Sequence, residues 1–307
     1  MKIFNFVILF FTTLVIISCE KKSEKVTNPK DYNVFLEMKE NKSLDFTNSE
    51  IDFWQKKFDA APNQITYLSQ IASNYSKLFE IRGNINDLYK SEDLLIKSNE
   101  ALKYSDVKNI RSLSRNYISQ HRFKEALVLA NKALDIGEGM IETQKLLFDV
   151  NMELGNYTEA QKNLNFLINM KDFDFLIRIS KWNDHLGDLK TAISFMEKAR
   201  DIAISNDNKE SKIWAFSNLG DLNGHAGNIK IAYDYYLKTL AVEPNNSYAL
   251  KGIAWIAFSY EKNTTEAKRI IDFVSKKYNS PDFYLLKSQI AEYEKNNDSE
   301  KQKINKL

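Results

Sequence analysis

The sequence has few residues that form disulfides, interrupt helices or coordinate metal ions. It has one cysteine, four prolines, nine glycines and three histidines in 307 residues. A lone cysteine excludes an intrachain disulfide. The few prolines and glycines leave long stretches uninterrupted, which favours helices. No G-x-x-x-x-G-K-S/T, H-E-x-x-H or G-x-S-x-G pattern occurs, so no motif supports an enzyme of those classes.

Net charge is also small, because 43 basic residues face 41 acidic ones and leave a formal charge of +2. This balance gives no reason to expect a nucleic acid as partner. His121, His185 and His225 fall at equivalent turn positions of the repeat described below. Neighbouring repeats stack about 10 Å apart, farther than two bonds of about 2 Å to one zinc ion can span. Neither a metal site nor another cofactor is predicted.

A short loop followed by an alanine-centred helix recurs five times between residues 121 and 267. The copies are HRFKEA (121–126), GNYTEA (155–160), GDLKTA (187–192), GNIKIA (227–232) and NTTEA (263–267). Their marker alanines, Ala126, Ala160, Ala192, Ala232 and Ala267, lie 34, 32, 40 and 35 residues apart. A small residue is expected where two helices cross closely. The period therefore predicts helical hairpins that bury their apolar faces by stacking.

The copy between Trp214 and Pro244 resembles the tetratricopeptide family most fully. The matching residues are Phe216, Leu219, Gly220, Gly227, Ala232, Tyr236 and Pro244. Asn223 stands where the family prefers Tyr, and Thr239 where it prefers Ala. The resemblance implies an all-α, right-handed superhelical solenoid of tetratricopeptide-like hairpins over residues 63–296. It also implies a non-catalytic scaffold that binds a protein or peptide partner.

Both ends of the repeat domain are expected to be covered. Residues 47–62 predict an amphipathic N-terminal capping helix, and residues 281–297 predict a closing helix with one apolar stripe. Residues 297–307 form a polar tail without an apolar face.

The first nineteen residues indicate export. Lys2 precedes an apolar run that reaches Ser18 and Cys19, the single cysteine. This ending resembles the bacterial lipobox, and it implies removal of residues 1–18 as a signal peptide and lipidation of Cys19. The alternative is an uncleaved anchor over residues 3–18, near the lower limit of about 17 residues for a spanning helix. Residues 19–46 are expected to be the lipidated terminus and a tether, with a short helix near residues 32–38.

The location within the cell envelope is inferred from resemblance to known bacterial lipoproteins. Glu20 is not the Asp that retains enterobacterial lipoproteins at the inner membrane, which favours the outer membrane. The composition, rich in Lys, Asn and Ile, resembles proteins of Flavobacteria and other Bacteroidetes, many of which display lipoproteins on the cell surface. Their usual export signal is an acidic run, whereas this chain has EKKSEK. The periplasmic face is therefore expected, with surface exposure as the alternative.

A partner is expected on the concave surface, which the first helix of each hairpin forms in tetratricopeptide arrays. Aligning the repeats predicts twelve residues on this concave surface: Lys108, Arg111, Arg115, Lys145, Asp149, Lys181, Trp214, Asp221, Tyr248, Lys251, Trp255 and Phe258. Exposed Trp and Tyr side chains beside charges resemble a binding hot spot. The alternative for Trp214 and Trp255 is packing between repeats, which an alignment error of two residues would produce.

Two functional classes remain open at this stage. The favoured one is a lipid-anchored adaptor for outer-membrane assembly, secretion or protease recruitment. The other is a glycan-binding lipoprotein akin to the SusD-like proteins, which also contain these repeats. That family forms its sugar site from long inserted loops, and this sequence has only a modest insertion at residues 206–211.

Overall fold

The computed structural model describes residues 25–304 apart from residue 39 and residues 169–171, with side chains up to residue 297. This part of the chain contains fifteen α-helices, one π-helical turn and no strand, so the predicted all-α fold is confirmed. The elements are α1 (Pro29–Glu37), α2 (Lys42–Ala60), α3 (Thr66–Arg82), α4 (Ile85–Ala101), α5 (Val107–Ser119), α6 (Phe123–Ile136), α7 (Met140–Glu153), α8 (Tyr157–Phe166), α9 (Phe173–His185), α10 (Leu189–Ser205), α11 (Lys209–His225), α12 (Ile229–Val242), α13 (Ser247–Trp255), η1 (Ile256–Tyr260), α14 (Thr264–Val274) and α15 (Pro281–Ile304).

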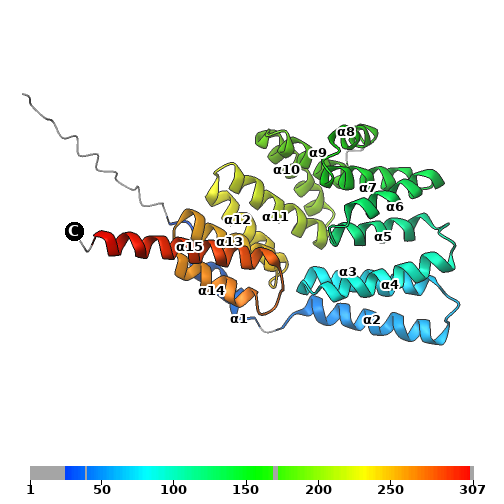
Figure 1. Cartoon of the computed structure of the whole chain (residues 1–307), viewed down its shortest axis with the longest axis horizontal. Coiled ribbons are helices and arrows are strands. Elements are labelled where there is room, and N and C mark those ends of the chain that lie inside the picture. Colours follow the sequence, from blue (N-terminus) through cyan, green and yellow to red (C-terminus); the bar gives the residue numbers. More distant parts are fainter. Residues whose placement is uncertain (1–24, 39, 169–171, 305–307) are drawn as a thin grey trace, which may run out of the picture.

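Helices α2 to α15 form one continuous array, in which consecutive helices pair into hairpins and hairpins stack side by side (Figure 1). The hairpins are α3/α4, α5/α6, α7/α8, α9/α10, α11/α12 and α13/α14, with α2 before the first and α15 after the last. Helix α2 begins five residues earlier than the expected capping helix, at Lys42. Helix α15 continues through Ile304, past the expected start of the polar tail. The Glu, Lys and Gln residues of that tail are good helix formers, which accounts for the extension.

The five repeated turns share one backbone conformation. The residue five positions before each marker alanine has a positive φ angle: Gly155, Gly187 and Gly227, but also His121 and Lys262, each at 58°. A left-handed backbone costs a non-glycine residue about 1–2 kcal/mol. Its presence in the two turns without glycine shows that the hairpin geometry requires it. The marker alanines are all fully buried, as expected where two helices cross.

The ring of Tyr236 on α12 lies between two glycines of neighbouring helices. A Cβ atom on Gly220 of α11 would lie 2.5 Å from Cε1 of Tyr236, and one on Gly252 of α13 would lie 2.5 Å from its Cζ. Both distances are far shorter than van der Waals contact. The absence of a side chain at these positions therefore lets the Tyr236 ring fill the space between the two first helices.

The array curls until its two ends meet. The backbone N–H of Asn279, between α14 and α15, donates to the carbonyl oxygen of Arg82 at the end of α3 (3.2 Å). A Cβ atom on Gly83 would overlap Asn279 and the Tyr278 ring, so the two segments are in close contact. Earlier on α3, the Lys77 ammonium lies 3.6 Å from a Glu210 oxygen on α11.

The segment before α2 closes the array from outside. Tyr32 of α1 is fully buried in a cluster with residues of α12, α13 and α14, and its hydroxyl donates to Glu266 (2.6 Å). The Glu261 carboxylate accepts from the backbone N–H groups of Val26 (2.7 Å) and Thr27 (2.5 Å). Lys277 donates to the carbonyl oxygen of Met38 (2.5 Å). In Figure 1, α1 lies with α12 and α14, whereas α2 lies with α3.

The structure thus differs from the tether expected over residues 19–46, because the described part from residue 25 onward is packed against the array. The short helix expected near residues 32–38 corresponds to α1. The many charges and weak periodicity of residues 19–46 favour a solvated linker when only the sequence is considered. Docking buries Tyr32 and Leu36 of this segment and removes their apolar surface from water. Residues 1–24 lie outside the described part.

Replacing Tyr32 by Ala should lower the free energy of unfolding by about 3–5 kcal/mol, the usual cost of deleting a large buried aromatic ring. Tyr32→Phe keeps the ring and loses only the hydrogen bond to Glu266, so it should cost about 1 kcal/mol. Urea unfolding followed by circular dichroism measures both changes. A Tyr32→Ala protein as stable as the parent would show that α1 does not dock in solution.

Gly220→Ala should lower stability by about 1–3 kcal/mol through overpacking against Tyr236. Gly224→Ala on the same helix is the matched control, because its Cβ would meet only Trp255, at an ordinary 3.8 Å. That control should gain up to about 1 kcal/mol from the higher helix propensity of alanine. Thermal melting of the two variants checks the prediction, and equal melting temperatures would contradict it.

Candidate functional site

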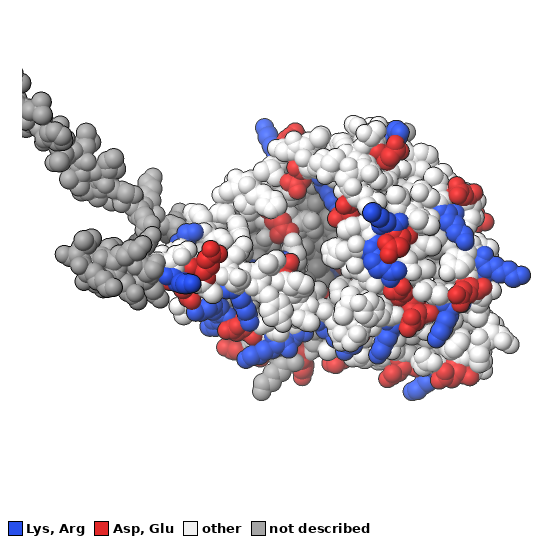
Figure 2. All heavy atoms as spheres, viewed as in Figure 1, with Lys and Arg blue, Asp and Glu red and all other residues white. Residues whose placement is uncertain are grey.

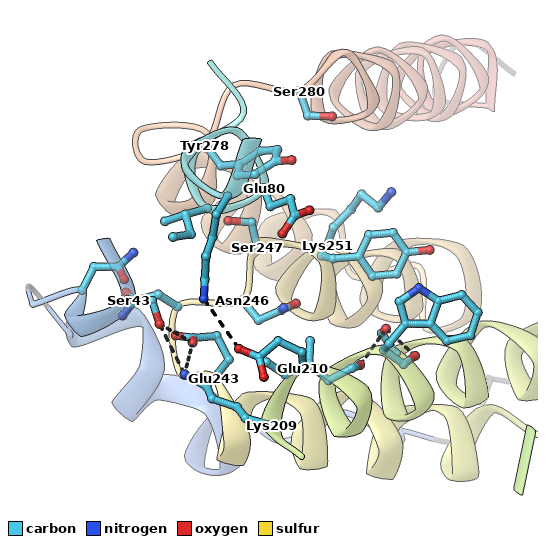
Figure 3. Close-up of a pocket in the computed structure, with 18 of the residues that line it drawn as sticks. Ser43, Glu80, Lys209, Glu210, Glu243, Asn246, Ser247, Lys251, Tyr278 and Ser280 are labelled. Carbon is cyan, nitrogen blue, oxygen red and sulfur yellow. Dashed lines mark hydrogen bonds and ion pairs between the residues drawn. The ribbon is translucent and has the colours of Figure 1, made fainter. Parts of the chain in front are cut away.

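A cavity of about 650 Å³ lies where the curled array meets its own first helices. The start of α2, the end of α3, the first turns of α11, the start of α13 and the α14–α15 connection all line it (Figure 3). Figure 2 shows the molecule hollowed on the face of Figure 1, with acidic and basic side chains mixed around the opening. The cavity exists only because the ends of the array approach each other.

A second cavity of about 440 Å³ adjoins the first, because both are lined by Tyr248, Lys251 and Asp282. It extends along α11, α13 and α15, and its wall includes Trp255 and Leu285. The two cavities together are called the groove below. Their volumes are in the range of sites that hold small ligands or the side chains of a peptide.

Aromatic side chains form one wall of the groove. Trp214 lines the larger cavity, Trp255 the smaller one and Tyr248 both. Their exposed fractions are 39%, 38% and 45%, so all three rings present much of their surface to solvent. The structure therefore places Trp214 and Trp255 on the concave surface and does not bury them between repeats. Their part in binding a partner remains a prediction.

A half-buried carboxylate, that of Asp221, holds Tyr248 of this wall in position. Asp221 accepts hydrogen bonds from the hydroxyls of Tyr236 (2.7 Å) and Tyr248 (2.5 Å). Burial raises the pKa of Asp221, although both hydrogen bonds and the nearby Lys251 oppose the rise. Burial, followed by the Asp221 charge, also raises the pKa of Tyr248, so its hydroxyl stays protonated as a donor. The Lys251 ammonium lies 4.6 Å from the centroid of the Tyr248 ring and 2.7 Å from Asp282.

Two of the predicted basic groove residues are buried instead. Arg111 is 6% exposed and donates to the carbonyl oxygens of Glu138 and Gly139 and to the hydroxyl of Thr143. Lys145 is 4% exposed and lies 2.7 Å from an Asp174 oxygen. Both side chains are long enough to reach the next repeat, where they satisfy polar groups within the stack. Their expected place on an open binding surface was wrong.

The remaining charged residues of the prediction lie outside both cavities. Asp149 pairs with Arg178 (2.6 Å), and Lys181 pairs with Glu153 (2.7 Å). Lys108 and Arg115 are exposed, and Arg115 lies 3.9 Å from Glu142. The concave surface is therefore not a basic strip, because ion pairs between repeats neutralise most of its charge.

Phe258 was also misplaced by the sequence alignment. It is 9% exposed, belongs to the core cluster and lies edge-on to Tyr293 at 5.7 Å. The cause is the π-helical turn η1, which follows α13 directly. A π turn holds more residues than an α turn and rotates every later side chain around the helix axis. Trp255 precedes the turn and keeps the groove position, whereas Phe258 is turned into the core.

The groove also contains residues that sequence analysis did not single out. Glu80 at the end of α3 and Tyr278 in the α14–α15 connection line the larger cavity. No local pattern marks them, because α3 and residue 278 become neighbours only when the array closes. In Figure 3 both project from above toward Ser247 and Lys251 of α13.

Neither a metal centre nor a membrane span is found in the part of the chain that the structure describes. No group of three or more His, Cys, Asp or Glu side chains is placed there to hold a metal ion. No helix in residues 25–304, outside the gaps given above, is long and apolar enough to cross a bilayer. Cys19, the predicted lipidation site, lies outside the described residues.

The helical hairpins, left-handed turns and buried marker alanines define a tetratricopeptide-like repeat array. No family model and no curated protein matches the sequence. The crystal structure of the APC/C hetero-tetramer Cut9–Hcn1 is similar, with a TM-score of 0.60 and 15% identity over 80% of this chain and 46% of that chain. Yeast Tom70 matches with a TM-score of 0.55 and 10% identity over 83% of this chain and 60% of its own.

TTC0263, a thermophilic TPR protein of Thermus thermophilus, matches with a TM-score of 0.51 and 18% identity. The match covers 61% of this chain and 98% of that chain. This chain spans less than two thirds of the Cut9–Hcn1 and Tom70 chains that it matches. At these identities the likeness shows a shared fold, and it confirms the tetratricopeptide-like architecture.

Proposed function

We propose that this protein is a lipid-anchored, non-catalytic adaptor that holds a protein or peptide partner in the groove. The observation that carries the proposal is the exposed aromatic wall of Trp214, Tyr248 and Trp255. Such rings give much contact area and lose little side-chain entropy on binding. Tyr248 is also held in place, since its hydroxyl bonds Asp221 and the Lys251 ammonium lies over its ring.

The shape of the groove favours an extended segment over a folded domain. Its two adjoining cavities of about 650 and 440 Å³ can accept successive side chains of one peptide. A protein partner also agrees with the similar structures, since Cut9 is described as part of a hetero-tetramer with Hcn1. The glycan-binding alternative receives less support, because residues 206–208 form only a short connection and residues 209–211 already belong to α11.

The anchor in this proposal is Cys19, and the location is the periplasmic face of the outer membrane in a bacterium related to Flavobacteria. Lipidation would attach the array to the bilayer, with each buried methylene contributing about 0.8 kcal/mol. The outer-membrane roles consistent with such an adaptor are assembly, secretion or recruitment of a protease.

In-cell crosslinking of the full-length protein, followed by mass spectrometry, should identify one dominant envelope partner. Replacing Trp214, Tyr248 and Trp255 together by Ala should abolish its capture, since each hot-spot ring contributes about 2 kcal/mol or more. Tyr89, Tyr157 and Phe166, which are exposed outside the groove, replaced together by Ala are the matched control and should keep the partner. Capture that survives in the groove variant, or no enriched protein in any sample, would contradict the proposal.

Cys19→Ala should leave an uncleaved or unanchored protein that does not incorporate a fatty acid, because the thiol that would be acylated is absent. Ser18→Ala keeps a small residue before the cysteine and should remain processed and lipidated. Membrane fractionation and metabolic labelling with a fatty acid analogue measure both. A parent protein that carries no fatty acid label and is retained as fully as Cys19→Ala after carbonate washing would show that residues 3–18 span the membrane instead.

A further inference from the structure

All but one of the charged side chains that line the larger cavity form ion pairs with one another, and the exception is acidic. Three lysines and four acidic residues line it. The pairs are Lys77 with Glu210 (3.6 Å), Lys209 with Glu243 (2.7 Å) and Lys251 with Asp282 (2.7 Å). The fourth acid is Glu80, for which the described residues provide neither a hydrogen bond nor an ion pair.

Glu80 is aimed into this cavity. It projects from the last turns of α3 toward Ser247 and Lys251 on the opposite wall (Figure 3). Its side chain is exposed to the cavity, while the surrounding protein raises the pKa of its carboxyl group by burial. The charge of Lys77 lowers this pKa, but by less than burial raises it. The carboxylate of Glu80 has therefore lost part of its hydration without forming a hydrogen bond or an ion pair with the described residues in return.

The cations nearest to Glu80 along α3 are occupied. Lys77 lies one turn earlier, and its ammonium faces Glu210. The guanidinium of Arg82 is bound in bidentate fashion to Asp87, at 2.6 Å for each hydrogen bond. The array therefore keeps the carboxylate unpaired, although basic residues precede and follow it in the sequence.

Aromatic rings surround the same space. Trp214, Tyr248 and Tyr278 line the cavity with Glu80. The negative face of an aromatic ring attracts a cation, and a carboxylate forms a strong charge-assisted hydrogen bond with one. An acidic side chain or a terminal carboxylate would instead meet Glu80 with like charge. The cavity is complementary to a positively charged side chain on an apolar stem.

We infer that Glu80 is the specificity-determining residue of the groove, and that the partner inserts an arginine or lysine side chain of an extended segment into the larger cavity. This inference rests on the proposed function, because it names the chemistry of the partner that the groove holds. The aromatic wall then packs along the stem of the inserted side chain, and Glu80 binds its charged end.

The test is a selection of random twelve-residue peptides displayed on phage, against the full-length protein in detergent micelles. The parent protein should enrich peptides with Arg or Lys at one position. Glu80→Gln should still enrich peptides but without that preference, and Glu80→Lys should enrich Asp or Glu there. Glu100→Gln removes an exposed carboxylate of α4 outside the groove and should select the same peptides as the parent.

Fluorescence polarisation with one selected peptide then measures the interaction between Glu80 and the basic residue of the peptide. The affinity of this peptide should fall roughly tenfold or more for Glu80→Gln, as expected for loss of a hydrogen bond to a charged group. A version with norleucine in place of the basic residue should bind the parent about as weakly, and Glu80→Gln should not weaken it further. Melting curves of the variants verify that each is folded.

The outcomes separate the two proposals. Peptides selected without a basic preference, or equal affinities for the basic and norleucine peptides, would overturn the role of Glu80 and leave the adaptor intact. No enriched peptide with the parent protein would overturn both. A basic preference that persists in Glu80→Gln and Glu80→Lys would also overturn the inference.

Discussion

The contact between the two ends of the array is the constraint on which the rest of the structure depends. Tyr32 is buried by helices more than 200 residues later in the chain, and its hydroxyl bonds Glu266. Residues 278 and 279 pack on Gly83 at the end of α3. Most tetratricopeptide-like arrays bury surface only between neighbouring repeats. Here the end-to-end contact adds long-range burial and narrows the concave surface into a groove.

A second set of contacts connects the close packing of α11, α12 and α13 to the aromatic wall of the groove. Because Gly220 and Gly252 have no side chain, the Tyr236 ring fits between α11 and α13. Its hydroxyl then reaches Asp221, whose second oxygen holds Tyr248. A ring held in this way loses little entropy when a partner binds. The same small residues that allow the helices to stack also preorganise the aromatic wall.

The charges of the concave surface serve two different purposes. Arg111 and Lys145 satisfy polar groups of the next repeat and are buried there, and Asp149 and Lys181 form ion pairs between repeats. Removing one partner of such a pair leaves the other charge uncompensated, so these contacts also set the spacing of repeats. Glu80 is the exception in the larger cavity, because the closure of the array brings it near Lys251 and Tyr278 but gives it no ion pair with any residue that the structure describes.

The sequence alone determined the helical hairpins, the turns that precede each marker alanine, and the places of Trp214, Asp221, Tyr248, Lys251 and Trp255 on the inner surface. These follow from the 3.6-residue period and the repeat length, which report on local geometry and on the next hairpin. Tertiary structure decided the docking of α1, the burial of Arg111 and Lys145, and the meeting of Glu80 with Tyr278. The π turn that buries Phe258 likewise has no signature in the period. The physical reason is that a contact across 200 residues depends on curvature summed over every repeat, and a local pattern does not contain that sum.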